Sequence, residues 1–300
     1  MLALVAPGQG SQTPGMLTPW ISDSDSRQLL ATWSEAIDLD LIHLGTQADA
    51  DEIRDTANAQ PLIVAAGLLS ARALGVDNDA AFMAGHSVGE ITAAAIAGVF
   101  SESDALRLVR TRGVEMAKAA IGSESGMSAV LGGVREDVLQ AIADAGLVAA
   151  NDNGGGQIVA AGDLRALSTL APEGARVRPL QVSGAFHTDF MKPALEGFKA
   201  FAAGLVVHDA KVGLVSNKDG AVLLSGERIL NRIIEQVANP VRWDLCMSSM
   251  ESSGVTRAIE IVPAGTLVGL LKRGAPHISI FALKSPDDLD NARTFARMKG

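Results

Sequence analysis

Residues 80–100 have the sequence AAFMAGHSVGEITAAAIAGVF, which contains the pattern G-x-S-x-G at positions 85–89. In a nucleophile elbow, this pattern turns a strand sharply into a helix and raises one serine hydroxyl above the sheet. The apolar residues 80–84 predict the strand, and the small residues of 90–100 predict the helix. Because all three parts are present, Ser87 is a candidate covalent nucleophile. The competing interpretation, in a chain with 31 glycines, is a glycine-rich turn that holds an inert serine.

The composition is that of a globular chain with a large core. Its 300 residues and 48% hydrophobic content suit one large α/β domain with an insertion, or two modest domains. The formal net charge of −9 argues against binding of nucleic acid or of an anionic membrane, because both need a dominant positive field. The only cysteine, Cys246, excludes an intrachain disulfide, and we expect it to be a small buried hydrophobe without a catalytic role. Residues 1–6 are too short and uncharged for a signal peptide, so we expect a cytoplasmic protein.

Strand and helix signals alternate along most of the chain. A short strand over 2–6 ends in the loop Pro7-Gly8-Gln9-Gly10-Ser11-Gln12, whose glycines allow the backbone to approach another group closely. Helical periodicity covers 23–37, 60–74 and 101–120, and the last of these begins with the capping box Ser101-x-x-Asp104. After residue 188, the pattern predicts helices over 190–203, 229–237, 244–252 and 267–273, with strands over 212–216 and 258–261. This order predicts a layered α/β core.

The pattern changes between residues 126 and 188. Strands are predicted over 127–131, 147–151, 157–161 and 176–182, and helices over 135–145 and 164–170. The resulting order, β-α-β-β-α-β, is that of a ferredoxin-like unit. We therefore expect an α/β protein with two parts. Residues 1–125 and 189–300 form an α/β-hydrolase-like large subdomain with a parallel-sheet core, and residues 126–188 form an inserted ferredoxin-like subdomain.

A serine nucleophile needs a base within hydrogen-bonding reach, and the chain offers five histidines. His187 follows a predicted strand and precedes a predicted helix, so its loop can aim the imidazole back at the elbow. His208, beside Asp209, is the alternative base. His86 is adjacent to Ser87 and cannot easily fold back onto the hydroxyl, so we expect it to pack at the elbow.

Arg112 lies on the apolar face of the predicted helix 101–120. It shares that face with Leu108, Val109 and Met116 at the i, i+3 and i+4 spacings that bring side chains together. An inward guanidinium is costly without a partner, which implies a fixed carboxylate or a ligand anion. The alternative is an arginine that snorkels outward or pairs with an internal acid.

The elbow alone would suggest an α/β-hydrolase esterase, but the HGGG-type loop and the acid-then-histidine order of that family are not evident. The chain instead resembles the malonyl-CoA:acyl carrier protein transacylase family from its first strand to about residue 285. Pro263-Ala264-Gly265 stands where many members have Gly-Pro-Gly, a small departure outside the catalytic positions. Three of the motifs that carry the resemblance are PGQGSQ at 7–12, GHSVGE at 85–90 and the pair Arg112-Gly113 followed by Met116. A fourth is the N-x-N…GQ segment, with Asn151, Asn153, Gly156 and Gln157. The others are Phe186-His187, NPVRW at 239–243 and PAGTLVGLLKR at 263–273.

This resemblance implies a ping-pong malonyl transfer through a Ser87–His187 dyad. The serine would attack the malonyl thioester while His187 takes its proton, and a backbone carbonyl, which by position is that of Gln236, would orient the histidine. The backbone N–H groups of Gln9 and Val88 would hold the oxyanion. Arg112 would bind the free malonyl carboxylate, so acetyl-CoA would be disfavoured. The resemblance further implies substrate-pocket roles for His86, Met116, Asn151, Asn153 and Phe186.

The same resemblance implies malonyl-CoA and the phosphopantetheine of acyl carrier protein as substrates, with no resident cofactor or metal. Phe186 is similar to the malonyl-preferring pattern rather than the methylmalonyl-preferring one. Because such carrier proteins are acidic, docking would need local positive charge, and the candidates are Arg107, Arg110, Lys118, Lys272 and Arg273.

Other functions remain open at this point. Within the transferases, the chain could supply a polyketide pathway or act in malonate decarboxylation rather than in fatty-acid synthesis. From other classes, it could be a serine thioesterase or esterase, or a catalytically silent subunit that binds a carrier protein.

Overall fold

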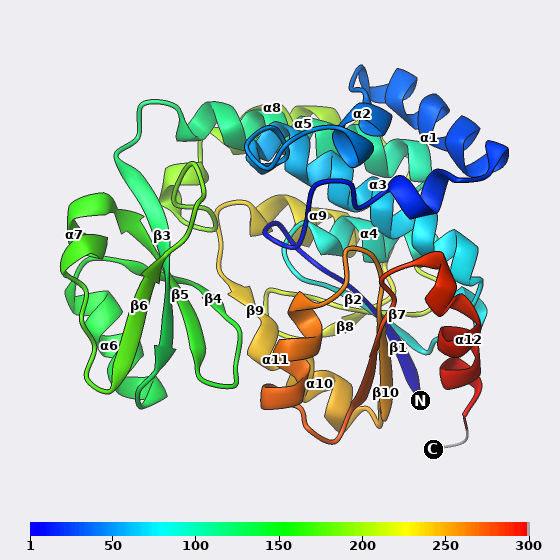
Figure 1. Ribbon diagram of the computed structural model, residues 1–300. Coiled ribbons are helices and arrows are strands. Elements are labelled where there is room, and N and C mark those ends of the chain that lie inside the picture. Colours follow the sequence, from blue (N-terminus) through cyan, green and yellow to red (C-terminus); the bar gives the residue numbers. More distant parts are fainter. Residues whose placement is uncertain (299–300) are drawn as a thin grey trace.

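The computed structural model describes residues 1–298 as an α/β protein built on two sheets (Figure 1). The larger sheet has the strand order β11-β10-β1-β2-β7-β8. All of its neighbouring pairs are parallel except the last, in which β8 pairs with β7 in antiparallel orientation. The strands are β1 (Leu2–Ala6), β2 (Phe82–Gly85), β7 (Gly213–Val215), β8 (Val222–Leu223), β10 (Arg257–Glu260) and β11 (Ser279–Ala282).

Helices cover both faces of this sheet, which explains why its central strand is apolar throughout. All five residues of β1 are buried, as expected for a parallel strand packed on both sides. Leu2 and Leu4 belong to the core shared with α3 (Thr56–Leu74), α4 (Gly89–Ile96) and α5 (Glu102–Ala120). Ala3 and Val5 belong to the core shared with α10 (Trp243–Ser252) and α11 (Thr266–Gly274). Figure 1 shows these two helical layers on opposite sides of the sheet.

The helices around the larger sheet differ in part from those expected. The predicted helix 90–100 ends at Ile96, because Gly98 adopts the left-handed conformation with φ 83°. The predicted helix 60–74 begins earlier, at Thr56, where the side chain of Asp55 accepts a hydrogen bond from the N–H of Ala57. The helices are α1 (Ser24–Ile37), α2 (Leu41–Thr46), α3 (Thr56–Leu74), α4 (Gly89–Ile96), α5 (Glu102–Ala120), α8 (Ala194–Ala202), α9 (Gly226–Gln236), α10 (Trp243–Ser252), α11 (Thr266–Gly274) and α12 (Leu289–Arg297).

The smaller sheet has the order β6-β3-β5-β4-β9 and its own hydrophobic core. Its first four strands pair in antiparallel orientation, and β9 adds to β4 in parallel. The predicted strand 176–182 ends at Pro179, although the N–H of Leu180 still donates to the carbonyl oxygen of Met127 on β3. The elements are β3 (Ser125–Gly132), α6 (Arg135–Asp144), β4 (Val148–Asp152), β5 (Gln157–Asp163), α7 (Leu164–Thr169), β6 (Ala175–Pro179) and β9 (Val241–Arg242).

Strand β9 ties the two sheets together. Its two residues come from the segment between α9 and α10, far along the chain from β4, yet they pair with Asn151 and Asp152. The same segment continues directly into Trp243 at the start of α10, which packs on the larger sheet. None of the helices formed by residues 1–298 combines the length and the apolar character needed to cross a bilayer.

Candidate active site

Ser87 lies on the turn between β2 and α4 and has the left-handed backbone conformation, with φ 53°. A non-glycine residue in this region is strained, and such strain concentrates at functional sites. The flanking glycines make the turn possible. A Cβ at Gly85 would overlap the backbone of Gly89, and one at Gly89 would overlap the carbonyl oxygen of Ala6. The predicted strand, turn and helix are therefore all present around a serine held in a strained conformation.

His187 lies within hydrogen-bonding distance of this serine. Its Nε2 is 2.8 Å from Ser87 Oγ, and its Nδ1 is 2.7 Å from the backbone carbonyl oxygen of Gln236. Since a carbonyl only accepts, Nδ1 carries the proton and donates it, which leaves Nε2 free to accept the serine proton. Burial, followed by the charge of Arg112, lowers the pKa of His187 to about 3. The imidazole is therefore neutral at physiological pH. The alternative base, His208, does not line the cavity that contains Ser87.

Arg112 is buried beside the same hydroxyl. It is 1% exposed, and Gly113 allows α5 to approach α3 closely, because a Cβ there would come within 2.9 Å of the carbonyl oxygen of Thr56. Nη1 donates to Gln60 Oε1 at 2.7 Å, and Nη2 donates to Gln236 Oε1 at 2.9 Å. Nη2 is also 3.4 Å from Ser87 Oγ.

The guanidinium of Arg112 is held by neutral groups. Among residues 1–298, no carboxylate comes within 4.0 Å of it, and its Nε has no hydrogen-bond partner. Burial lowers the pKa of Arg112 to about 10, and the charge of Glu90 opposes this shift. A cation fixed by amide oxygens in this way retains the capacity to bind an incoming carboxylate.

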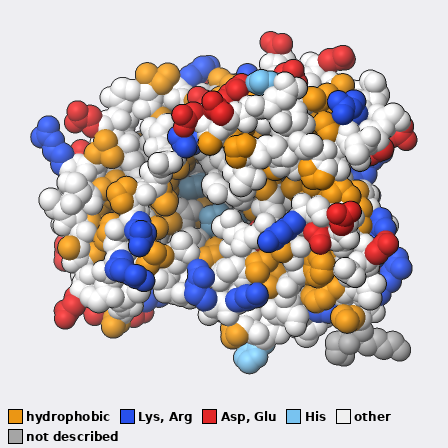
Figure 2. Space-filling model, in the orientation of Figure 1, with side chains coloured by type: hydrophobic (Ala, Val, Ile, Leu, Met, Phe, Trp, Pro, Cys, Tyr) orange, Lys and Arg blue, Asp and Glu red, His pale blue; other side chains and the backbone are white. Residues whose placement is uncertain are grey.

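The three side chains meet in a cavity of about 230 Å³, which is lined by strands of the smaller sheet and by loops and helices that surround the larger one. Figure 2 shows the hollow on the molecular surface, with histidine surface inside it. His86 does pack at the elbow, as expected: its Nε2 is 2.8 Å from Asn153 Oδ1, and its ring centroid is 5.6 Å from that of Trp243. The cavity brings together every predicted pocket and oxyanion residue, namely Gln9, His86, Val88, Met116, Asn151, Asn153 and Phe186.

The candidate docking residues are distributed unequally around this cavity. Arg273 Nη2 donates to Oε1 of Gln157, which lines the cavity, so the end of α11 lies at its edge. On α5, Arg110 donates to the carbonyl oxygen of Ala57 and Lys118 pairs with Glu115 at 2.7 Å. Arg107 lies 3.9 Å from Asp104. Arg273 is therefore the candidate with a direct connection to the cavity.

Three buried polar residues of the site had no predicted role. Gln60 lies 1% exposed within the apolar helix α3, where a polar residue among hydrophobic neighbours is itself a signal. Asn217 accepts a hydrogen bond from the N–H of Ser87 and donates to the carbonyl oxygen of Gly85, which fixes the turn. Glu90 ends the GHSVGE motif and accepts from both Asn217 and Gln236. Burial raises the pKa of Glu90, and the N–H of Asn217 and the charge of Arg112 oppose that shift.

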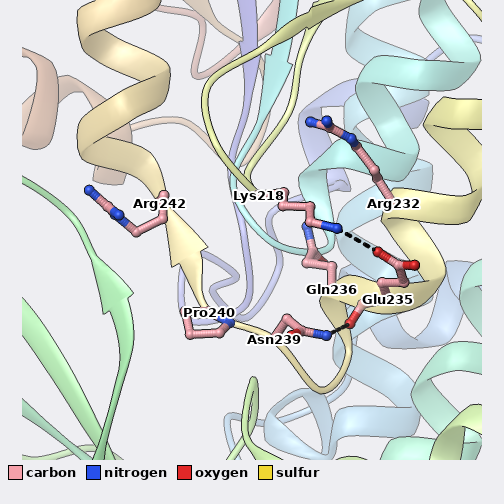
Figure 3. A pocket seen from close by; sticks show the side chains of 7 residues that line it. All are labelled: Lys218, Arg232, Glu235, Gln236, Asn239, Pro240 and Arg242. Atoms are coloured by element: carbon pink, nitrogen blue, oxygen red, sulfur yellow. Dashed lines mark hydrogen bonds and ion pairs between the residues drawn. The ribbon is translucent and has the colours of Figure 1, made fainter.

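A second cavity, of about 270 Å³, borders Gln236 at the end of α9 (Figure 3). Each of its three cations is paired with a carboxylate: Lys218 with Glu235, Arg232 with Asp219, and Arg242 with Asp244. The charges around this cavity are thus already balanced. Within residues 1–298, no group of three or more His, Cys, Asp or Glu side chains is placed to hold a metal ion.

The α/β fold, the serine on its strained turn and the neutral histidine beside it are typical of enzymes that transfer acyl groups through a serine. The comparison with known families agrees, because the acyl transferase domain matches residues 3–298. The malonyl CoA-acyl carrier protein transacylase of Mycobacterium tuberculosis is 51% identical over 297 residues, covering 97% of this chain and 98% of that protein. The protein of the same name from Bacillus subtilis is 35% identical over 306 residues, covering 97% and 96%.

The similarity extends to solved structures. A crystal structure of the M. tuberculosis enzyme superimposes with a TM-score of 0.94 at 51% identity, covering 98% of this chain and 99% of that one. An acyl-carrier-protein-S-malonyltransferase from Bartonella henselae gives 0.93 at 31% identity, covering 99% of both chains. The chain therefore belongs to the malonyl CoA-acyl carrier protein transacylase family.

Proposed function

We propose that this acyltransferase moves the malonyl group of malonyl-CoA to the phosphopantetheine thiol of acyl carrier protein, for fatty-acid synthesis. One observation carries the proposal: Ser87 Oγ lies 2.8 Å from a neutral His187 Nε2 and 3.4 Å from the buried guanidinium of Arg112. A nucleophile and its base thus share one cavity with a cation suited to the free carboxylate of a malonyl group.

In the first half-reaction, Ser87 Oγ attacks the thioester carbonyl carbon while its proton passes to His187 Nε2. The tetrahedral intermediate collapses, the C–S bond breaks, and the imidazolium returns the proton to the sulfur of coenzyme A. In the second half-reaction, the carrier thiol gives its proton to His187 and attacks the malonyl-serine ester, and Ser87 regains a proton as it leaves. The Gln236 carbonyl holds the imidazole in the tautomer that both steps require.

The backbone N–H groups of Gln9 and Val88 are the proposed oxyanion donors. Both residues line the cavity, and within residues 1–298 neither N–H has a hydrogen-bond partner. Val88 also precedes the first residue of α4, where the helix dipole favours negative charge. Donors of this kind contribute about 2.7–4 kcal/mol each to transition-state stabilisation in related acyl transfers.

We further infer that residues 126–188 form a ferredoxin-like subdomain, which is inserted into an α/β-hydrolase-like large subdomain. The large subdomain comprises residues 1–125 and 189–300, and its last two residues, 299–300, lie outside the described residues. The strand order β6-β3-β5-β4 and the separate core support this division. The cavity takes Met127 and Val159 from the smaller sheet and Ser87 from the larger part of the chain. In this arrangement the small subdomain would limit access of water to the malonyl-serine ester.

The proposal is tested by incubating the protein with malonyl-CoA and, separately, with acetyl-CoA, and by then measuring its intact mass. A malonyl-serine ester adds about 86 Da. The labelled enzyme is next divided between apo and holo carrier protein. Transfer to the holo form alone supports the transferase, whereas loss of the adduct at the same rate in buffer would indicate a hydrolase.

The low pKa of His187 predicts an unusual pH profile. We expect single-turnover acylation of Ser87 to keep its rate from about pH 7 down to about pH 5. The pKa of His187 is lowered to about 3, so the base stays neutral over this range. A histidine with the ordinary pKa of about 6.5 would be protonated there. Rapid-quench rates across this range, with folding checked by circular dichroism at each pH, provide the measurement. An acid limb with its midpoint near 6.5 would contradict the burial argument.

The position of Arg273 predicts a role in carrier docking. Arg273→Glu is expected to raise the KM for acyl carrier protein about three- to tenfold at low salt, because it reverses a charge at the edge of the cavity facing an acidic partner. Steady-state transfer at two salt concentrations measures this, with Lys272→Glu as the neighbouring variant. Arg165→Glu, an exposed arginine on α7, is the matched control. Equal effects at positions 165 and 273 would rule out a specific contact at Arg273.

A further inference from the structure

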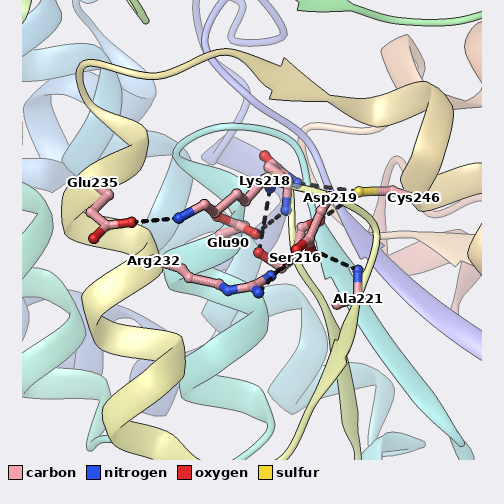
Figure 4. A network of polar contacts seen from close by, with 9 residues as sticks. Glu90, Ser216, Lys218, Asp219, Ala221, Arg232, Glu235 and Cys246 are labelled. Atoms are coloured by element: carbon pink, nitrogen blue, oxygen red, sulfur yellow. Dashed lines mark hydrogen bonds and ion pairs between the residues drawn. The ribbon is translucent and has the colours of Figure 1, made fainter.

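Glu90 is a buried carboxyl group at the start of α4 that takes no part in the chemistry described above. It is 2% exposed, and its Oε1 accepts a hydrogen bond from the backbone N–H of Asn217 at 2.6 Å. Its Oε2 accepts from the side-chain amide of Gln236. Figure 4 shows Glu90 among side chains of the segment that follows β7, of α9 and of α10. Both carboxylate oxygens are thus engaged by N–H donors from other parts of the chain.

Gln236 connects Glu90 to the reacting groups. Its backbone oxygen accepts from His187 Nδ1, and its side-chain Oε1 accepts from Arg112 Nη2 at 2.9 Å. Its Nε2 faces only acceptors: the Glu90 carboxylate, Asn217 Oδ1 at 3.1 Å and the carbonyl oxygen of Ser87 at 3.2 Å. Because an amide has one donating and one accepting end, these contacts determine which end faces Arg112. The contact with Glu90 is the shortest of the three.

We propose that Glu90 is a positioning residue: it holds the Gln236 amide with Oε1 toward Arg112, and so keeps the guanidinium directed at the malonyl carboxylate. The inference rests on the proposed function, since it assigns a residue to malonyl selection at the same site. Glu90 itself makes no hydrogen bond with Arg112, whose side chain donates to Gln60 and Gln236 and lies beside Ser87, so Glu90 does not occupy the guanidinium that the substrate carboxylate would meet.

The isosteric variant Glu90→Gln separates this role from simple packing. The backbone N–H of Asn217 cannot turn, so the new amide keeps its oxygen toward that N–H and directs its NH₂ group at the NH₂ of Gln236, where two donors face each other. Gln236 can relieve the clash only by turning its own amide, which would put its NH₂ against Nη2 of Arg112. In a crystal structure of Glu90→Gln, we therefore expect no hydrogen bond between the side chains of Arg112 and Gln236, while the backbone oxygen of Gln236 still binds His187.

The kinetic test compares the acylation efficiency, kcat/KM, for malonyl-CoA and acetyl-CoA. Glu90→Gln is expected to lower the malonyl-to-acetyl ratio about tenfold or more, in keeping with a buried donor left unsatisfied beside the substrate. Glu260→Gln is the matched control, because Glu260 is also fully buried and its oxygens accept from the backbone N–H groups of Gly265, Leu267 and Val268. We expect this control to lose stability and to keep the wild-type ratio. A wild-type ratio in Glu90→Gln, or an intact Arg112–Gln236 hydrogen bond in its structure, would overturn the inference.

A second variant makes the inference testable if Glu90→Gln fails to fold. Gln236→Met removes the amide but keeps the backbone carbonyl that binds His187, so it should lower the same ratio by a similar factor. Where both variants fold, the double variant should lose no more than the greater single loss, because Glu90 acts through Gln236. The inference would be overturned if the fold losses of the two single variants multiplied in the double variant, or if Gln236→Met kept the wild-type ratio. Failure of the wild-type enzyme to form any malonyl adduct would instead reject the proposed function, and the Glu90→Gln structure would still decide the positioning of Arg112.

Discussion

Ser87→Ala is expected to abolish the malonyl adduct and to lower kcat on the order of a millionfold, the loss that removal of such a serine causes in a serine hydrolase. The reason is geometric, because Ser87 is the hydroxyl placed 2.8 Å from His187 Nε2 at the end of β2. Intact-mass measurement after incubation with malonyl-CoA shows the adduct directly, and stopped-flow transfer to carrier protein gives the rate. The backbone of the turn should tolerate the change, although alanine at φ 53° keeps the strain of that conformation.

The control for this prediction is the other strong nucleophile of the chain. Cys246 is fully buried, and burial raises the pKa of its thiol, so the thiolate that an acyl transfer would need does not form. Cys246→Ser should therefore keep the adduct and most of the rate. An adduct of equal mass and formation rate in Ser87→Ala would place the acyl group on a different residue and would refute the mechanism.

Local signals were sufficient to predict the main elements of this fold. The elbow, the buried first strand and the amphipathic helix α5 each carry a pattern of their own, and the structure confirms all three. The paired strands around the Gly154–Gly156 turn are present as well. In contrast, β8 and β9 have two residues each, too few for any periodicity. They are held by pairing with β7 and β4, so only the tertiary structure reveals them.

A residue of the candidate site could be predicted where its type is unusual among its neighbours in the sequence. A lone arginine on an apolar helix face indicates burial, and the structure buries Arg112. The contacts of that arginine were not predictable, because Gln60 and Gln236 reach it from helices 52 and 124 positions away. An internal carboxylate partner was one of the two expectations. The structure instead places neutral amides against the guanidinium, with Glu90 one contact further away.

The arrangement around Arg112 leads to the second large prediction. Arg112→Ala should lower kcat/KM for malonyl-CoA at least about a hundredfold, because breaking a buried ion pair costs about 3–5 kcal/mol. Acetyl-CoA has no free carboxylate to pair, so its kcat/KM should fall far less or rise. The preference for malonyl over acetyl would then largely disappear, and parallel acylation rates with the two thioesters measure it.

Arg107→Ala is the matched control for the Arg112 variant, because it removes an arginine from the exposed side of the same helix. We expect it to keep the preference of the wild type. The amides of Gln60 and Gln236 lose their charged partner in Arg112→Ala, so some loss of stability is also expected, and unfolding must be measured alongside the rates. An equal fall for both thioesters would mean that Arg112 supports the structure of the site, whereas a fall confined to malonyl-CoA means that its charge selects the substrate.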